Sequence, residues 1–161
     1  EMSRGLGDVY KRQCLFYPSF QFKKNRSEYY RQLTSVRERG TYEEWIEFFC
    51  NSLLESAKDS VGSLKNLVDL HNRSTATITE NLGRTAANGQ RLLGILEEHP
   101  IVDTAFIAAQ LDIGRSTASS LVKSFEELGI LRPLDESRQR YRQYGYEEYL
   151  SILREDAEPI R

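Results

Sequence analysis

The stretch DTAFIAAQLDIGRSTASSLVKSFEELGIL, Asp103 to Leu131, reads as two short amphipathic helices joined by a three-residue break. The Asp103 side chain is placed to cap the first helix. Asp112-Ile113-Gly114 forms the break, because aspartate tolerates the left-handed backbone and glycine restricts it little. Ala108 stands four residues before the break, where two helices cross closely and a larger side chain would clash. Gly129 is placed to end the second helix. This spacing predicts a helix-turn-helix.

The residues that follow predict a short β-hairpin. Ile130 and Leu131 are expected to form a strand, residues 135–137 a turn, and Arg138–Tyr144 the return strand. A short helix over Glu147–Leu153 closes the domain. The expected core comprises Phe106, Ile107, Ala108, Leu111, Ala118, Leu121, Val122, Phe125 and Leu128, with Ile113 between the two helices. The layout is that of a winged helix-turn-helix, which we place at residues 83–155 with 156–161 as a tail.

Upstream, the periodicity predicts further helices. Ser27–Glu38 is helical by spacing and Gly40 ends it, while Thr41-x-x-Glu44 matches a capping box that opens a long helix to about Leu70. That helix carries one apolar stripe, formed by Tyr42, Trp45, Ile46, Phe49, Leu53, Ala57, Val61, Leu64 and Val68. The polar residues 71–82 are expected to be a connector. A further amphipathic stretch begins at Leu82 and stops at His99-Pro100.

Composition excludes several classes of protein. The 161 residues contain 22 Lys and Arg against 24 Asp and Glu, so the net charge of −2 excludes a uniformly basic coat for nucleic acid. Two cysteines and two histidines cannot form a disulfide framework or a cysteine metal site, and we expect no metal. No apolar run approaches the ~18–20 residues of a membrane span. We expect a cytoplasmic protein with reduced thiols and no membrane partner.

Residues 1–13, EMSRGLGDVYKRQ, show neither helical nor strand periodicity. We interpret them as translated sequencing-adapter sequence, with a native disordered arm as the alternative. Under the first interpretation the protein's own sequence begins near Cys14 and continues a longer protein.

The second helix of the helix-turn-helix predicts candidate DNA contacts, because this fold reads DNA with the N-terminal half of that helix. The candidates on the helix are Arg115, Ser116, Thr117, Ser119, Ser120 and Lys123. Arg138, Arg140 and Arg142 alternate along the return strand and form a candidate phosphate clamp. However, the region from Gly83 onward has ten basic and thirteen acidic residues, a net charge of −3. A docking or regulatory role therefore stays open beside DNA binding.

The segment YPSFQFKKNRSEYYRQLTSVRERGTYEEWIEFF, Tyr17 to Phe49, resembles the end of a Fic domain, and LGRTAANGQRLLGILEEHPIV, Leu82 to Val102, with the winged domain behind it, resembles the C-terminal domain of many bacterial Fic proteins. The family transfers AMP from ATP to hydroxyl side chains of target proteins. The resemblance implies a mainly α fold: the last helices of a truncated Fic domain over residues 14–70, followed by the winged domain. Asp112 and Gly114 depart from the glycine and serine that usually stand there in the family.

The family's catalytic motif, H-P-F-x-D/E-G-N-G-R, is absent from the sequence. His99-Pro100 continues as Ile101-Val102-Asp103 and lies in the winged part, so we expect no catalytic residue, no cofactor and no enzyme activity in this chain. The resemblance implies that an intact protein adenylyltransferase would use ATP and Mg²⁺. It also implies that Tyr30, Leu33 and Arg37 border the adenine pocket of that protein, although helical-bundle packing is an alternative for the first two.

Two functions remain. The first is the C-terminal part of a Fic protein whose partner is the missing part of the Fic domain. The second is a DNA-binding transcriptional regulator whose N-terminal helices dimerise. Because the stripe lacks a partner surface, we expect the chain by itself to aggregate or form a homodimer.

Overall fold

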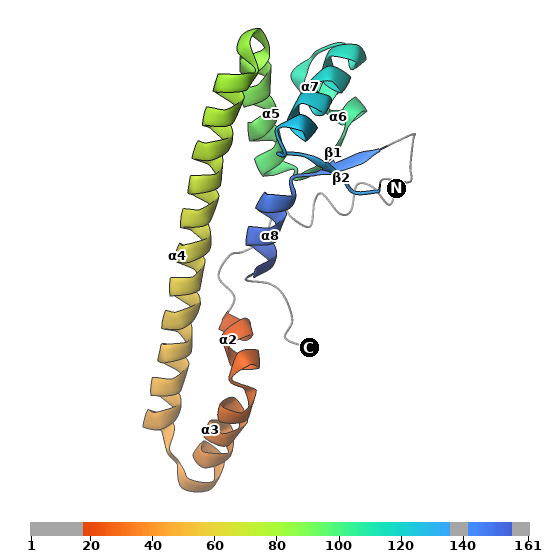
Figure 1. Ribbon diagram of the computed structural model, residues 1–161. Coiled ribbons are helices and arrows are strands. Elements are labelled where there is room, and N and C mark those ends of the chain that lie inside the picture. Colours follow the sequence, from red (N-terminus) through yellow and green to blue (C-terminus); the bar gives the residue numbers. More distant parts are fainter. Residues whose placement is uncertain (1–17, 136–141, 156–161) are drawn as a thin grey trace. The chain divides into compact units, whose positions relative to one another are not determined.

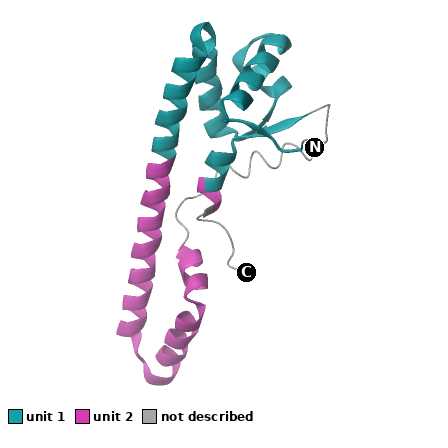
Figure 2. Cartoon of the chain, in the orientation of Figure 1, with its two compact units in different colours: residues 1–13, 67–151 teal, residues 14–66, 152–161 magenta. Residues whose placement is uncertain are grey.

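The computed structural model describes residues 18–135 and 142–155. The described chain falls into two compact units (Figure 2). The first contains Leu67–Ser151, and the second contains the described residues up to Asn66 together with the end of the last helix. The helix α4, Tyr42–Asn81, continues from one unit into the other. The fold is mainly helical with a small antiparallel sheet, as the sequence predicts.

The first unit has the predicted helix-turn-helix and wing strands (Figure 1). After the last turns of α4 come the short 3₁₀ helix η1 (Gly83–Thr85), α5 (Ala86–Glu98), β1 (Ile101–Asp103), α6 (Thr104–Leu111), α7 (Arg115–Glu127), β2 (Arg132–Pro133), β3 (Gln143–Gly145) and α8 (Glu147–Glu155). The three strands form an antiparallel sheet in the order β1-β3-β2. In this sheet Tyr144 pairs with Val102 on one side and with Pro133 on the other.

One strand prediction is wrong, and one strand was not predicted. Ile130 and Leu131 do not form the first hairpin strand, which begins at Arg132. The backbone amides of both residues donate to the carbonyl oxygen of Phe125, so they finish the end of α7, and both side chains are buried. The strand β1 was not predicted at all. Of the predicted return strand, residues 138–141 lie outside the described residues, and the described part pairs at 143–145.

The core of this unit consists largely of the side chains that the periodicity predicts. It includes Leu92, Leu93, Leu96, Ile107, Leu111, Ala118, Leu121, Val122 and Phe125, all buried. Leu128 and Ile113 are only half-buried, and so is Phe106. The buried set is the amphipathic face of each helix, which confirms the 3.6-residue reading of α5, α6 and α7.

The predicted connector at 71–82 is wrong, because α4 continues as a helix to Asn81. Its last turns belong to the core of the winged unit: Leu70 is 2% exposed and Ile78 is 0% exposed. Ser74 is buried between them, and its hydroxyl lies 2.7 Å from the hydroxyl of Tyr146. A sequence rich in Ser and Thr remains helical here because one face, at steps of four, is covered by the domain.

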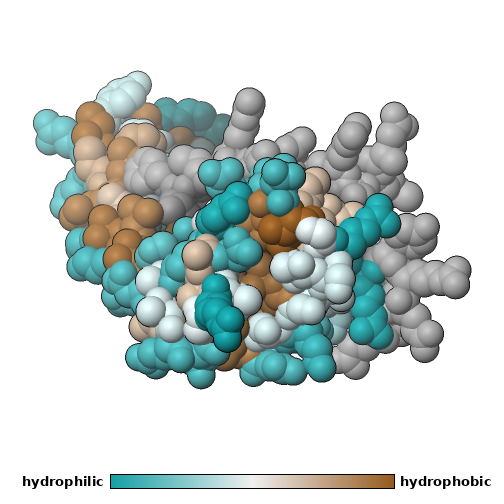
Figure 3. Space-filling model, turned by 90° about the horizontal axis from the view of Figure 1, so that it is seen from above, coloured by the Kyte–Doolittle hydropathy of each residue, from teal (hydrophilic) through white to brown (hydrophobic). Residues whose placement is uncertain are grey.

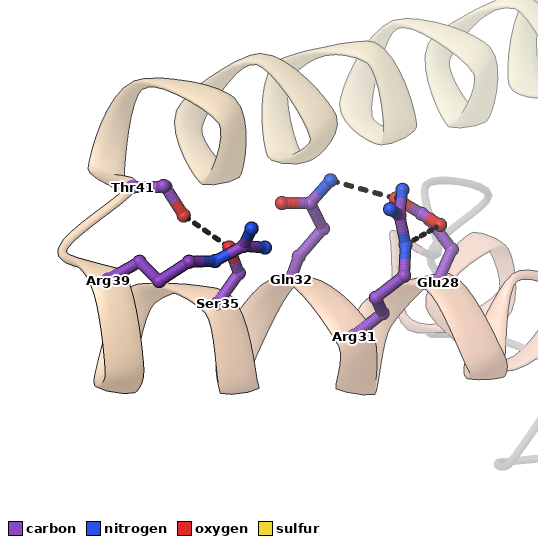
Figure 4. Close-up of polar contacts among 6 residues, drawn as sticks. All are labelled: Glu28, Arg31, Gln32, Ser35, Arg39 and Thr41. Atoms are coloured by element: carbon purple, nitrogen blue, oxygen red, sulfur yellow. Dashed lines mark hydrogen bonds and ion pairs between the residues drawn. The ribbon is translucent and has the colours of Figure 1, made fainter.

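The second unit is built from α2 (Pro18–Lys24), α3 (Arg26–Arg39) and the first part of α4. α2 was not predicted. Gly40 adopts the left-handed conformation that ends α3, as predicted. Between the two long helices the Thr41 hydroxyl lies 2.6 Å from Ser35 Oγ (Figure 4). Near the start of α3, Glu28 accepts hydrogen bonds from Arg31 and Gln32 (Figure 4). These bonds lower the pKa of Glu28, and the bond from Arg31 is the largest cause.

The α4 helix buries serines and exposes hydrophobic side chains. Ser52, Ser56, Ser60 and Ser63 are buried along one line. The stripe residues Tyr42, Ile46, Phe49, Val61, Leu64 and Val68 are between 38% and 63% exposed. The side-chain amide of Gln21 in α2 donates a hydrogen bond to the Asp59 carboxylate of α4 at 2.6 Å. The contact between α2 and α4 is therefore partly polar. Six of the nine stripe residues are exposed, whereas Trp45, Leu53 and Ala57 are half-buried.

Candidate nucleic-acid interface

The turn between α6 and α7 is fixed by local hydrogen bonds. Asp103 Oδ1 accepts from the Phe106 amide at 2.7 Å, which confirms the predicted N-cap of α6. Asp112 adopts the left-handed conformation with φ of 54°, and the following amide, of Ile113, donates to the Ala108 carbonyl. Gly114 is extended and is the N-cap of α7, which begins at Arg115. These bonds set the direction in which the first turn of α7 leaves the domain.

The six predicted contact residues of α7 lie together on its solvent side. Arg115, Ser116, Thr117, Ser119, Ser120 and Lys123 are all exposed. The opposite face of the same helix is buried through Ala118, Leu121, Val122 and Phe125. From Arg115 to Phe125 the helix contains no acidic residue, and the first, Glu126 and Glu127, come in its last turn. Lys123 Nζ lies 3.8 Å from the Glu127 carboxylate in an exposed pair, which is weak.

The N-terminal turn of α7 is suited to bind an anion. Gly114 supplies no side-chain cap, so no side chain of the N-cap residue occupies the free amides of the first turn. The helix dipole places partial positive charge at the same end. Arg115 and the hydroxyls of Ser116 and Thr117 lie in that turn, so backbone amides, hydroxyls and a guanidinium can meet one phosphate group.

The predicted wing clamp is only partly described. Arg142 is exposed just before β3. Arg138 and Arg140 lie outside the described residues, so their shared face stays a prediction. Arg132 on β2 is an exposed cation that the sequence reasoning did not single out. Its position next to Gly145 in the sheet register follows from the corrected start of the hairpin.

Acidic residues that made the domain net negative are engaged elsewhere. Glu97 Oε1 lies 2.6 Å from His71 Nδ1, and Glu148 accepts from Arg73 at 2.7 Å. Both partners are on α4, so these carboxylates lie on the side of the unit that carries this helix. The Glu148 hydrogen bond is the first cause of the raised pKa of Arg73. The negative net charge therefore does not describe the face formed by α7.

The described surface in the view of Figure 3 is mixed. Hydrophilic and near-neutral side chains make up most of the coloured surface in this view, with apolar side chains between them.

In the described residues no group of three or more His, Cys, Asp or Glu could hold a metal ion. Across the same part of the chain, the helices lack the length and apolarity needed to cross a membrane.

The predicted adenine-pocket residues lie on α3 in the other unit. Tyr30 is 54% exposed, Leu33 is 38% exposed, and Arg37 is exposed. The Arg26 guanidinium lies 5.6 Å from the centroid of the Tyr30 ring, and the centroid of the Tyr29 ring lies 5.5 Å from the same centroid, with the two rings edge to face. The Tyr30 and Leu33 side chains are thus exposed in this chain, and their role as pocket wall or as bundle core in a longer protein stays a prediction.

An aromatic cluster in the same unit was missed in part by sequence reasoning. Phe22 of α2 contacts Tyr29 at 5.5 Å and Phe49 at 5.6 Å between ring centroids. Trp45 contacts Tyr29 at 5.6 Å and also lies against Phe48. The signal available in the sequence was Phe20 and Phe22 just ahead of the α3 helix. Offset and edge contacts of this kind stabilise the meeting of α2, α3 and α4.

Comparison with known proteins gives no assignment: no protein-family model and no curated protein matches this sequence.

Proposed function

We propose that the winged unit binds double-stranded DNA through α7. The observation that carries this proposal is the exposed face of that helix, which presents Arg115, Lys123 and four hydroxyl side chains with no acidic residue before Glu126. Arginine can bond bidentately to guanine edges in the major groove, and hydroxyls bond to phosphate oxygens. Glu97 and Glu148 bond to His71 and Arg73 of α4, so part of the negative charge of the domain lies on the side of that helix and not on α7.

The contacts divide into two kinds. Ser116 and Thr117 in the first turn, with the free amides there, are suited to a phosphate and would fix the position of the helix on the duplex. Arg115 also stands in the first turn, where its guanidinium would join the phosphate contact. Ser119, Ser120 and Lys123 follow on the exposed side and would face base edges or the opposite strand. The wing arginines would add backbone contacts without sequence information.

The test measures binding of a fluorescent mixed-sequence duplex to the full chain by anisotropy at several salt concentrations. Arg115→Ala is expected to weaken binding several-fold and to reduce the salt slope by about 1. Arg140→Ala tests the wing in the same way. Lys24→Ala is the matched control, since it removes an exposed cation from α2 in the other unit. If no duplex binds at about 50 mM salt, or if Lys24→Ala weakens binding as much as Arg115→Ala, the proposal is wrong and a docking role for the winged unit is favoured.

We propose as a second function that this chain is the C-terminal part of a Fic protein adenylyltransferase. The exposure of Tyr30, Leu33 and Arg37 on one helix supports it, because a pocket wall must be free to meet a ligand. The Tyr30 ring and the Leu33 side chain offer an aromatic and an aliphatic surface to a purine. ATP is the ligand that would supply the AMP group. Within this chain we assign no residue to Mg²⁺.

The test starts from the source locus. We expect its reading frame to continue upstream of residue 14 into a histidine with a Gly-Asn-Gly loop, and the encoded protein to transfer AMP to a protein hydroxyl. In that protein Tyr30→Ala should raise KM for ATP several-fold, since it removes a contact made equally in ground and transition states. Tyr42→Ala is the matched control, because this tyrosine is exposed on α4. A reading frame without that motif would leave DNA binding as the only proposed function.

A further inference from the structure

The apolar stripe of α4 has spacings that read the same in both directions. Trp45 packs against Tyr29 and Phe48 within its own unit and is left aside. The other eight stripe positions are separated by steps of 4, 3, 4, 4, 4, 3 and 4 residues: Tyr42, Ile46, Phe49, Leu53, Ala57, Val61, Leu64 and Val68. Six of them are exposed, and Leu53 and Ala57 at the centre are half-buried. All lie on one continuous helix, with the centre of the stripe at residue 55.

We propose that the α4 helices of two copies of this chain pair antiparallel along this stripe, centred on residue 55. A two-fold axis at that point brings Tyr42 of one copy opposite Val68 of the second copy. By the same symmetry Ile46 meets Leu64, Phe49 meets Val61 and Leu53 meets Ala57. The two aromatic side chains thus each lie opposite a valine. The largest side chains lie opposite smaller ones, which allows the side chains of the two helices to interdigitate. Each of these eight positions has an apolar residue opposite it.

The charged residues beside the stripe favour this orientation. Glu43 and Glu47 are exposed one turn apart along one edge of the stripe, and Lys65 is exposed on the same edge near its other end. In the antiparallel pair Lys65 of one copy falls between Glu43 and Glu47 of the second copy. In a parallel pair this edge would lie on opposite sides of the seam in the two copies, so Lys65 would not meet Glu43 or Glu47 of the second copy. Opposite charges therefore meet along this edge only in the antiparallel pair.

The extent of the stripe is in the range of a weak to moderate dimer. It covers about 40 Å of helix at 1.5 Å per residue. From the exposed fractions, its side chains offer roughly 600 Å² per copy, against about 800 Å² per partner in an interface of standard size. A dissociation constant in the micromolar range is therefore expected, and the measurement needs protein between about 1 and 100 μM.

The first experiment measures the mass of the full chain by sedimentation equilibrium over that concentration range. We expect a monomer–dimer equilibrium. Val61→Lys should raise the dissociation constant about tenfold or more, because it places a charge in the centre of an apolar pair. Asn51→Lys is the matched control: this residue is exposed on the same helix but off the stripe, and it should change the constant less than about twofold. Circular dichroism checks that each variant is folded.

The second experiment distinguishes the two orientations by spin-label distances. A label on Cys50, in a Cys14→Ser background, should lie about 15 Å along the helix axis from its equivalent, and a label on Glu43→Cys, with Cys50→Ser added, about 36 Å. A parallel dimer would give the same short distance at both positions. Lys65→Glu should weaken the dimer, and adding Glu47→Lys should restore it, since Glu47 and Lys65 are 18 residues apart and pair only between copies.

A chain that stays monomeric at about 100 μM overturns the proposal, as do equal distances for the two labels. A monomer whose stripe binds the upstream part of a longer protein would show instead that this part covers α4. None of these measurements uses DNA or ATP, so they stand apart from the proposed functions.

Discussion

At the scale of single residues, Tyr146 joins α4 to the small sheet. Its side chain is 1% exposed, its hydroxyl lies 2.7 Å from Ser74 Oγ, and its amide donates to the Pro100 carbonyl. Burial raises the pKa of Tyr146 to about 12 and outweighs the hydrogen bond with Ser74, which acts in the opposite direction. The folded protein therefore holds the Tyr146 proton more tightly than the unfolded chain, where the pKa is 10.0.

This difference predicts a loss of stability at high pH. The contribution of neutral Tyr146 is complete below pH 10 and falls as the pH rises from 10 toward 12, by up to about 2–3 kcal/mol of unfolding free energy. Urea unfolding at pH 8, 9.5 and 11 measures it. Tyr146→Phe is expected to be less stable near pH 8 by about 1 kcal/mol, because Ser74 loses its partner, and to lose less between pH 9.5 and 11.

Burial also raises the pKa of Tyr149. The Tyr146→Phe variant should therefore retain part of the pH dependence. Identical pH profiles for the two proteins would contradict the assignment to Tyr146.

The residue scale also shows what local sequence can and cannot predict. The cap at Asp103 and the left-handed Asp112 were predicted, because each depends on residues within a few positions. The bond between Ser74 and Tyr146 joins residues 72 apart, and nothing in the spacing of either marks it. Ser74 therefore reads as part of a polar connector until its partner is known.

At the scale of elements, α5 contains two glycines in different surroundings. A Cβ added to Gly89 would lie 2.8 Å from Ile78 Cγ2 and 2.8 Å from Leu82 Cδ1. Ile78 has no room to move, since it is fully buried. Gly94 has no neighbour within 4 Å of the same position and is exposed. Close packing of α5 on the end of α4 thus explains why residue 89 is a glycine. No steric contact requires a glycine at residue 94.

We predict opposite effects for alanine at these two positions. Gly89→Ala should lower the free energy of unfolding by about 1 kcal/mol, because overpacking of ~1–3 kcal/mol exceeds the gain in helix propensity. Gly94→Ala should raise it by up to about 1 kcal/mol, because only the propensity gain remains. Thermal unfolding of both variants beside the parent protein measures this, and Gly94→Ala is the internal control. Equal stabilisation by both would mean that α4 and α5 are not in close contact.

The elements that the sequence failed to predict are those whose partners are distant. Periodicity located α5, α6 and α7, because each carries its own apolar face. The three-residue β1 has no such pattern and exists through pairing with β3. Ile130 and Leu131 have strand-like side chains, but their amides complete the end of α7. A local pattern of two apolar residues cannot decide between these uses.

At the scale of the whole molecule, the candidate site depends on where charge lies rather than on how much there is. The exposed residues of α7 were predicted from the helical period alone. A count along the chain could not show that Glu97 and Glu148 pair with His71 and Arg73, because those partners belong to the region read as a connector. Correcting that boundary therefore also changes the electrostatic argument for DNA binding.

The same correction predicts where the winged unit begins as an independent domain. A chain of residues 67–155 retains Leu70, Ser74 and Ile78, whereas a chain of residues 83–155 loses all three and uncovers Tyr146. Loss of the two buried aliphatic side chains alone costs about 3–6 kcal/mol. At roughly 4–8 °C per kcal/mol for a domain of this size, the shorter chain should melt at least about 12 °C lower, or not fold cooperatively. Calorimetry of both chains measures the difference. Equal melting temperatures would show that the last turns of α4 are dispensable, and would restore the boundary at 71–82.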